Sequence, residues 1–165
     1  MIRMKVKINN SKRMTILVGS LFVLFFFVVL VPFWFVNYLS LSGVGHFFEE
    51  NIIYSLLSLA VFIYFIIVGE YYYNIEIDSY IIKITSYRVI LDLFRKKDYI
   101  DIPHEMLIGF EFFNRPFSFN KTLMLKINTH KRRQVIKRFD LTLISEKEEQ
   151  KIRSILNTII ETKNK

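Results

Sequence analysis

The sequence predicts a membrane α-helical hairpin followed by an all-β (α+β) domain, an antiparallel sandwich or barrel of six or seven strands capped by a C-terminal helix. Three observations predict this class. Two long uncharged apolar runs fill residues 14–48 and 51–69, strand-like alternation follows at residues 70–143, and the last 20 residues carry one apolar stripe. A chain of 165 residues has room for one domain and a short appendage.

Composition narrows the class of protein without naming an activity. Hydrophobic residues make up 52% of the chain, which argues against a disordered protein. The chain has no cysteine, which excludes a disulfide scaffold, a thiol nucleophile and a zinc site built on sulfur. The 23 basic and 15 acidic residues give a net charge of +8, compatible with a nucleic-acid partner, an anionic lipid surface or a codon bias.

Both apolar runs are long enough to span a bilayer. Residues 14–48 and 51–69 carry no charge, and 17 of the 21 side chains at 16–36 are Ile, Leu, Phe or Val. Hydrocarbon about 30 Å thick takes roughly 20 helical residues. We therefore expect a basic N-terminal segment at 1–13 and a two-helix hairpin at 14–69, with spans at about 15–36 and 52–69.

A cleaved signal peptide and a pair of buried core helices are the alternatives to this hairpin. A signal peptide has an apolar region of about 7–15 residues and a small-residue cleavage site, and the first run is longer and lacks such a site. Core helices of a soluble protein would show a polar face, and neither run has one. Both alternatives are disfavoured.

The basic residues predict the orientation of the hairpin. Five of them precede the first run, none lies in the connection at 37–51, and 18 follow the second run. Because short cytoplasmic segments carry the excess of Lys and Arg, we expect a multi-pass protein with both termini in the cytoplasm and a cytoplasmic domain at 70–165. Gly43 and Gly45 would allow the outer turn.

Alternation of apolar and polar residues predicts the strands of the cytoplasmic domain. Polar or proline-containing turns separate them, and no strand alternates with a helix, which disfavours a parallel sheet. We expect strands at residues 73–78, 80–86, 89–94, 99–102, 107–113, 121–129 and 134–143. Five phenylalanines of this region fit core positions: Phe110, Phe112, Phe113, Phe117 and Phe119.

The final helix has a readable start and one apolar face. Ser145 and Glu148 have the spacing of a capping box, in which each side chain satisfies a backbone N–H group of the first turn. An apolar stripe follows at helical spacing and must be buried, with the open end of the β domain as the expected partner. The stripe consists of Ile152, Ile155, Leu156, Ile159 and Ile160.

The strand order, the final helix and one local motif together resemble a known family. Residues 102–110 read Ile-Pro-His-Glu-Met-Leu-Ile-Gly-Phe, similar to the I-P-x-x-x-I-x-x-V turn of bacterial pleckstrin-homology-like (PH-like) domains. Leu107 replaces the usual Ile, and residues 117–120 replace a Gly-rich turn. Over roughly residues 71–162 the chain resembles such domains in membrane proteins with an N-terminal two-helix hairpin. The resemblance implies the bacterial inner membrane and, for some members, peptide-antibiotic resistance or immunity.

The sequence predicts no catalytic, cofactor-binding or metal site. His46, His104 and His130 are isolated, and the His104-Glu105 pair is interpreted as a solvated turn. No phosphate-binding or nucleophile-elbow motif occurs. Asp98 and Asp101 are expected to be rim charges. We therefore predict a protein that is not an enzyme.

Basic clusters are the one feature that suggests a binding surface. They are expected at strand ends and hairpin tips, where anionic headgroups would attract each cation by roughly 1 kcal/mol. The other interpretation is that the charges are solvated and protect β edges from pairing. The candidate anion- or headgroup-binding residues are Arg95, Lys96, Lys97, Lys131, Arg132, Arg133, Lys137 and Arg138.

These features predict a non-enzymatic integral inner-membrane protein with a membrane-proximal interaction module. Its expected partners are the lipid bilayer and either anionic lipid headgroups or a protein segment, and no nucleic acid. Small residues in the second span (Ser55, Ser58 and Ala60) fit a homo-oligomer as well as the internal hairpin. The alternatives are a membrane effector with a ligand-sensing β-barrel in anti-phage signalling, or a peptide-antibiotic immunity protein.

Overall fold

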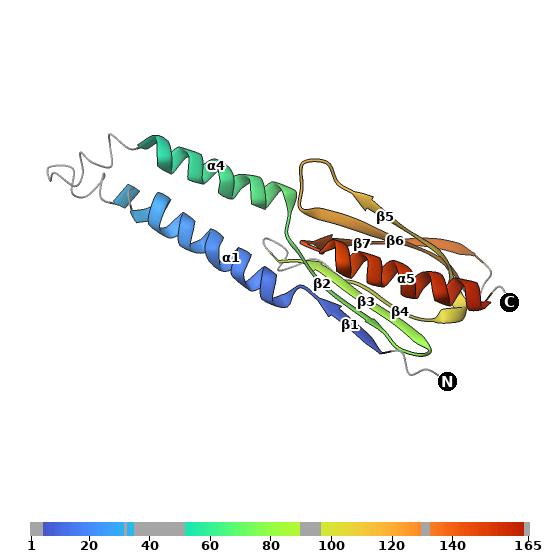
Figure 1. The fold of residues 1–165 in the computed structure, drawn as a ribbon. Helices are drawn as coiled ribbons and strands as arrows, with labels where there is room; N and C mark the ends of the chain where they lie inside the picture. The colour runs from blue at the N-terminus through green and yellow to red at the C-terminus, as the bar shows by residue number, and fades with distance from the viewer. Residues whose placement is uncertain (1–4, 32, 35–51, 90–96, 130–132, 164–165) are drawn as a thin grey trace, which may run out of the picture. The chain divides into compact units, whose positions relative to one another are not determined.

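The computed structural model describes residues 5–31, 33–34, 52–89, 97–129 and 133–163 (Figure 1). Contacts divide the chain into two compact units. Met1–Ser11 together with Glu70–Lys165 form the first, called the β unit here, and Lys12–Gly69 form the second, called the helical unit. The β unit is therefore built from both ends of the chain, and the helical unit is inserted between its parts.

The first sheet of the β unit has four antiparallel strands in the order β1-β2-β3-β4 (Figure 1). Alternate side chains of β2 and β3 point into the core, in agreement with the alternation in the sequence. Residues 89–94, expected to form a strand, lie outside the described residues except for Val89. The strands are β1 (Val6–Asn9), β2 (Tyr71–Ile77), β3 (Ile81–Arg88) and β4 (Asp98–Pro103).

Strand β1 was not expected from the sequence, which placed these residues in a basic N-terminal segment. It pairs antiparallel with β2, with Val6 opposite Ile77 and Asn9 opposite Asn74. Only Ile8 of its four side chains is buried in the core. A strand of four residues with one buried side chain gives no recognisable alternation, and its partner lies more than 60 residues away in the sequence.

Alternating charges cross the exposed face of this sheet in one row. The register places Lys7 opposite Glu76, Glu76 opposite Lys83, and Lys83 opposite Asp101. Lys7 Nζ lies 2.6 Å from Glu76 Oε1, and Lys83 Nζ lies 3.2 Å from Asp101 Oδ2. Opposite charges on directly facing residues favour this register, by roughly 0.2–1 kcal/mol for each pair.

The second sheet has three antiparallel strands in the order β5-β6-β7, as the spacing of the sequence predicts. A register shift between Leu107 and Gly109 marks a bulge near the start of its first strand. A 3₁₀ turn, η2 (His104–Met106), links the two sheets. The strands are β5 (Leu107–Asn114), β6 (Asn120–Asn128) and β7 (Gln134–Thr142).

Helix α5 (Glu146–Lys163) confirms the predicted C-terminal helix. Glu148 N donates to Ser145 Oγ at 3.3 Å and Ser145 N donates to Glu148 Oε2 at 2.9 Å, the two bonds of a capping box. The predicted stripe packs into the core, with Ile160 partly buried at its edge. The fold class of the described residues is therefore mixed α+β, with two antiparallel sheets and a C-terminal helix.

The core positions predicted for the phenylalanines are only partly right. Phe110 and Phe112 are partly buried and pack against the core. Phe113, Phe117 and Phe119 are exposed instead. Phe113 points to the opposite face from Phe112 near the end of β5, and the other two lie outside strands in the β5–β6 turn, where alternation no longer indicates a face.

The helical unit contains α1 (Ser11–Phe25), its π-helical continuation η1 (Phe26–Leu30) and α4 (Ile52–Val68). Within the unit, the rings of Phe25 and Phe62 stack with centroids 4.6 Å apart. Of the described helices, the 20-residue stretch Ser11–Leu30 alone has the length and composition of a bilayer span, because the apolar part of α4 is shorter. Pro32, Gly43 and Gly45 lie outside the described residues.

Asn10 joins the end of β1 to both sheets of the β unit. Its side chain is 1% exposed, and its Nδ2 donates to Tyr71 O and to Thr142 O, both at 2.9 Å. Its Oδ1 accepts a hydrogen bond of 2.9 Å from Tyr73 N. Tyr71 N also donates to Thr142 Oγ1 at 2.8 Å, so Tyr71 and Thr142 are linked both directly and through Asn10. One buried amide thus satisfies three backbone groups that would otherwise be unpaired.

We predict that Asn10→Ala destabilises the full-length protein by about 2–4 kcal/mol, because it leaves several buried backbone groups without partners. Thermal or chemical unfolding in detergent measures the change. The matched control is Asn128→Ala, at an exposed position at the end of β6, which should change stability by less than about 0.5 kcal/mol. Equal stability of the two variants would contradict the assigned role of Asn10.

Candidate functional site

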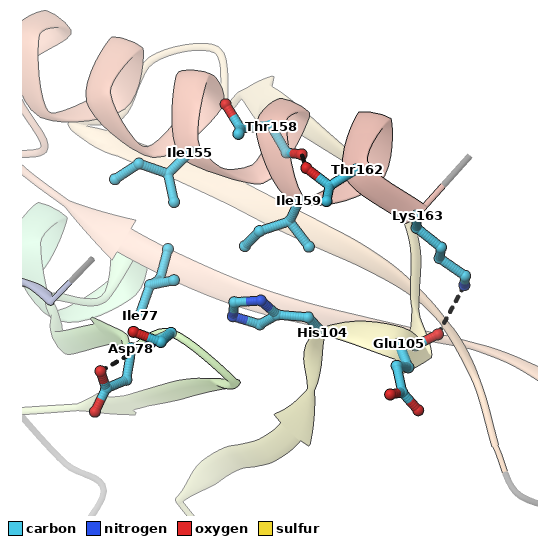
Figure 2. A pocket seen from close by; sticks show the side chains of 10 residues that line it. Ile77, Asp78, His104, Glu105, Ile155, Thr158, Ile159, Thr162 and Lys163 are labelled. Atoms are coloured by element: carbon cyan, nitrogen blue, oxygen red, sulfur yellow. Dashed lines mark hydrogen bonds between the residues drawn. The ribbon is translucent and has the colours of Figure 1, made fainter. Parts of the chain in front are cut away.

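A cavity of about 340 Å³ lies between the last turns of α5, the β2–β3 turn and η2. Figure 2 shows the His104 imidazole pointing into the space between Ile77 and Ile159. Two threonines of α5, Thr158 and Thr162, line its outer part. Size and partly apolar lining make this cavity the first place to look for a ligand.

His104 is the titratable group that this cavity half buries. Burial lowers the pKa of its imidazole, and the backbone of Asp78 and Ile81 opposes the shift only in part. The imidazole is therefore neutral at pH 7, and its buried Nε2 has no hydrogen-bond partner among the described residues. The sequence-based interpretation of a solvated turn holds for the exposed Glu105 and not for His104.

The charged groups around His104 do not form a catalytic arrangement. Lys163 Nζ donates to Glu105 O at 2.7 Å and to Leu107 O at 3.2 Å, so this cation fastens the end of α5 to η2. In Figure 2 the Glu105 carboxylate points away from the imidazole. Throughout the described ranges no three His, Asp or Glu side chains gather as metal ligands would. The cavity therefore presents a half-buried imidazole among isoleucine side chains, with Asp78 and Glu105 also in its lining.

The basic residues singled out in the sequence lie at different ends of the β unit. Lys97 precedes β4, beside the end of β3, and its Nζ lies 4.9 Å from the centroid of the Tyr87 ring. Arg133 closes the β6–β7 hairpin, where its carbonyl accepts a 3.0 Å hydrogen bond from Thr129 N. Four of the eight candidates lie outside the described residues: Arg95, Lys96, Lys131 and Arg132.

The remaining two candidates, Lys137 and Arg138, lie on β7. This strand forms one edge of its sheet, and its first five side chains are all exposed. Other cations of the β unit have acidic partners: Lys121 Nζ lies 2.6 Å from Glu149 Oε2, and Arg115 Nη2 lies 3.1 Å from Asp140 Oδ2. Lys137 and Arg138 form no such pair with a described residue, as expected of charges that protect an open β edge.

Glu70 is a buried titratable residue that the sequence analysis did not single out. It is 1% exposed, follows Gly69 with its positive φ of 76°, and accepts a 2.7 Å hydrogen bond from Val89 N through its carbonyl oxygen. Neither carboxyl oxygen has a hydrogen-bond partner among the described residues. Burial raises the pKa of the Glu70 carboxyl to about 7, and the smaller effect of the Arg88 charge acts in the opposite direction.

A signal for Glu70 was present in the sequence. It is the first charged residue after an uncharged run of 19 residues, at the point where helix changes to strand. Its carboxyl is neutral below about pH 7 and charged above it. The residue therefore places a pH-sensitive group at the entry to the β unit.

Comparison of the chain with protein-family models, curated proteins and solved structures found no match.

We predict that the stability of the wild-type protein falls relative to Glu70→Gln as the pH rises from 5 to 8. The folded protein binds the proton more tightly than the unfolded chain, so the stabilisation is complete below pH 4.5 and is lost as the pH rises through about 7. The expected relative change is on the order of 1 kcal/mol, or roughly 2–4 °C in melting temperature for a chain of this length.

Melting curves of the full-length protein in detergent at both pH values measure this difference. Glu161→Gln, at an exposed position on α5, is the control and should parallel the wild type. Identical pH dependence of the wild type and Glu70→Gln would show that the carboxyl does not titrate in this range.

Proposed function

We propose that the chain is a non-enzymatic integral protein of the bacterial inner membrane, and that its cytoplasmic β unit is a membrane-proximal interaction module. In this proposal residues 14–69, within the helical unit, form a two-helix transmembrane hairpin between the first two strands of the β unit. The pairing of β1 with β2 is the observation that carries the proposal.

This pairing supports an even number of membrane crossings. β1 ends just before the helical unit and β2 begins just after it, yet the two strands are neighbours in one sheet. A sheet cannot extend through a bilayer by itself, since its edges would leave backbone groups unpaired in hydrocarbon. The chain must therefore leave and return on the same side, and two crossings are the smallest number that inserts both apolar helices.

The helix lengths are compatible with two crossings. The 20 residues of Ser11–Leu30 extend about 30 Å, the thickness of the hydrocarbon. The 17 residues of α4 extend about 26 Å, enough for a crossing with little tilt and slight thinning of the bilayer. The basic residues that flank the hairpin on both sides favour a cytoplasmic β unit.

The architecture of the β unit supports the proposed relationship to PH-like domains. Its seven described antiparallel strands and one C-terminal helix agree with the six or seven strands and final helix that the resemblance implies. In this arrangement β1 takes the place of the first strand, and the hairpin replaces the turn between the first and second strands. A module held in this way would present its surfaces to lipid headgroups or to a protein segment at the bilayer.

The two ends of the β unit would differ in their distance from the bilayer. Lys97 lies at the end of the first sheet where β2 begins, so the proposed hairpin would bring it within reach of anionic headgroups. Arg133 precedes β7, whose opposite end bonds to Asn10, so about 27 Å of strand separates it from that attachment. We therefore propose headgroup contact for Lys97 and a solvent-exposed or protein-binding role for Arg133.

The described cavity does not favour the effector alternative. A pocket for a cyclic dinucleotide would need cations for its phosphates. The cavity near His104 contains Asp78 and Glu105, and its Lys163 is already bonded to backbone carbonyls. No observation favours a second function over the interaction module.

Single-cysteine labelling tests the proposed topology cleanly because the chain contains no cysteine. In intact cells a membrane-impermeant maleimide should label Ser42→Cys, in the connection expected outside, which lies beyond the described residues. Lys5→Cys and Asn128→Cys should react only after the membrane is permeabilised. Labelling of Lys5→Cys and Asn128→Cys from opposite sides of the membrane would refute the even number of crossings.

A further inference from the structure

Three exposed phenylalanines gather around the β5–β6 turn. Phe117 is 92% exposed, Phe119 57% and Phe113 45%. Full exposure of one phenylalanine is unremarkable, but three within seven residues form an apolar tip with a single charged residue, Arg115. Phe117 also has a left-handed backbone, with φ of 56°, which is uncommon for a bulky residue and carries a conformational cost.

The turn that carries these rings is held firmly. Arg115 N donates to Asn120 O at 3.2 Å, which closes the turn. Ser118 Oγ donates to Arg115 O at 3.3 Å, and the Arg115 guanidinium is bound by Asp140 at 3.1 Å. Because its only charge is paired toward the sheet, the tip presents rings rather than cations to its surroundings.

Hydrogen bonds place this turn at the end of the β unit where the helical unit is attached. Leu143 N donates to Phe119 O at 3.1 Å, and Thr142 Oγ1 donates to Asn120 Oδ1 at 2.5 Å. Thr142 in turn bonds to Asn10 and to Tyr71, the residues on either side of the inserted helices. Figure 1 likewise shows the β5–β6 connection at the end of the β unit where β2 begins.

We propose that the β5–β6 turn inserts Phe117 and Phe119 into the headgroup–acyl boundary of the cytoplasmic leaflet, as an attachment point separate from the hairpin. This inference rests on the proposed membrane hairpin, which brings this end of the β unit to the bilayer. Aromatic rings on a tip without acidic residues suit that boundary, which accommodates apolar groups to a depth of about 5–10 Å.

A lipid surface explains this tip better than a protein partner does. The rings are exposed on a turn and line none of the described pockets, and hydrogen bonds connect the turn through Leu143 and Thr142 to Tyr71. The hairpin alone would leave the β unit free to rotate about two chain connections. A third contact at the turn fixes which face of the β unit is turned away from the membrane.

Tryptophan quenching by brominated lipid tests the inference. In a Trp34→Phe background, which removes the only native tryptophan, Phe117→Trp and Phe119→Trp are reconstituted separately in vesicles with or without lipids brominated on their acyl chains. Tyr80→Trp is the matched control, since Tyr80 is 62% exposed in the β2–β3 turn at the opposite end of β2. Two positions in the turn protect the test against one variant that fails to fold.

We expect brominated lipid to lower the emission of Phe117→Trp and Phe119→Trp by about twofold and to leave Tyr80→Trp unchanged. Unquenched emission from both turn variants would overturn the inference. If that unquenched emission were also blue-shifted, the rings would be buried against protein instead of lipid. Trp34 in the unsubstituted chain reports on the hairpin separately. Quenched Trp34 with an unquenched turn leaves the proposed hairpin standing, whereas unquenched Trp34 contradicts the hairpin itself.

Discussion

The pairing of β1 with β2 is the constraint on which the rest of this structure depends. Four residues at the start of the chain complete a sheet whose other strands begin some 60 residues later. Closing a flexible loop of that length costs on the order of 3–4 kcal/mol in chain entropy. Ion pairing of Lys7 with Glu76, burial of Ile8 and the hydrogen bonds of Asn10 are the interactions that oppose this cost. Helices within the inserted segment reduce it further, because they shorten the flexible length.

The two ends of the β unit are stabilised in different ways, and this difference bears on function. At the end where β2 begins, polar groups dominate: the Asn10 amide, the Thr142 hydroxyl and the buried Glu70 carboxyl. At the other end, the last turns of α5 line the cavity, and Lys163 fastens the helix to η2. The first end combines backbone attachment, exposed rings and a titratable carboxyl. The second holds the cavity around His104, where a soluble ligand or protein segment would have access.

Much of the β unit could be predicted from the sequence, because its strands alternate and its last helix carries a capping box and one stripe. β1 could not, since one buried side chain in four residues gives no pattern and its partner is distant in the chain. The exposure of Phe117 also escaped prediction, because composition does not distinguish a turn from a strand end. The basic candidates were recognised as a group by charge alone, yet only the fold shows that Lys97 and Arg133 lie at different ends. Glu70 depends on burial, which sequence spacing does not reveal.

Disulfide cross-linking in isolated membranes tests the central constraint most directly. Paired strands bring facing Cα atoms within the 4.4–6.8 Å that a disulfide typically needs, whereas a position two strands away lies beyond that reach. We expect an oxidant to link Lys7→Cys to Glu76→Cys rapidly within one chain and to leave Lys7→Cys with Lys83→Cys unlinked. Equal linkage of both pairs, or linkage of neither in the folded protein, would contradict the pairing of β1 with β2.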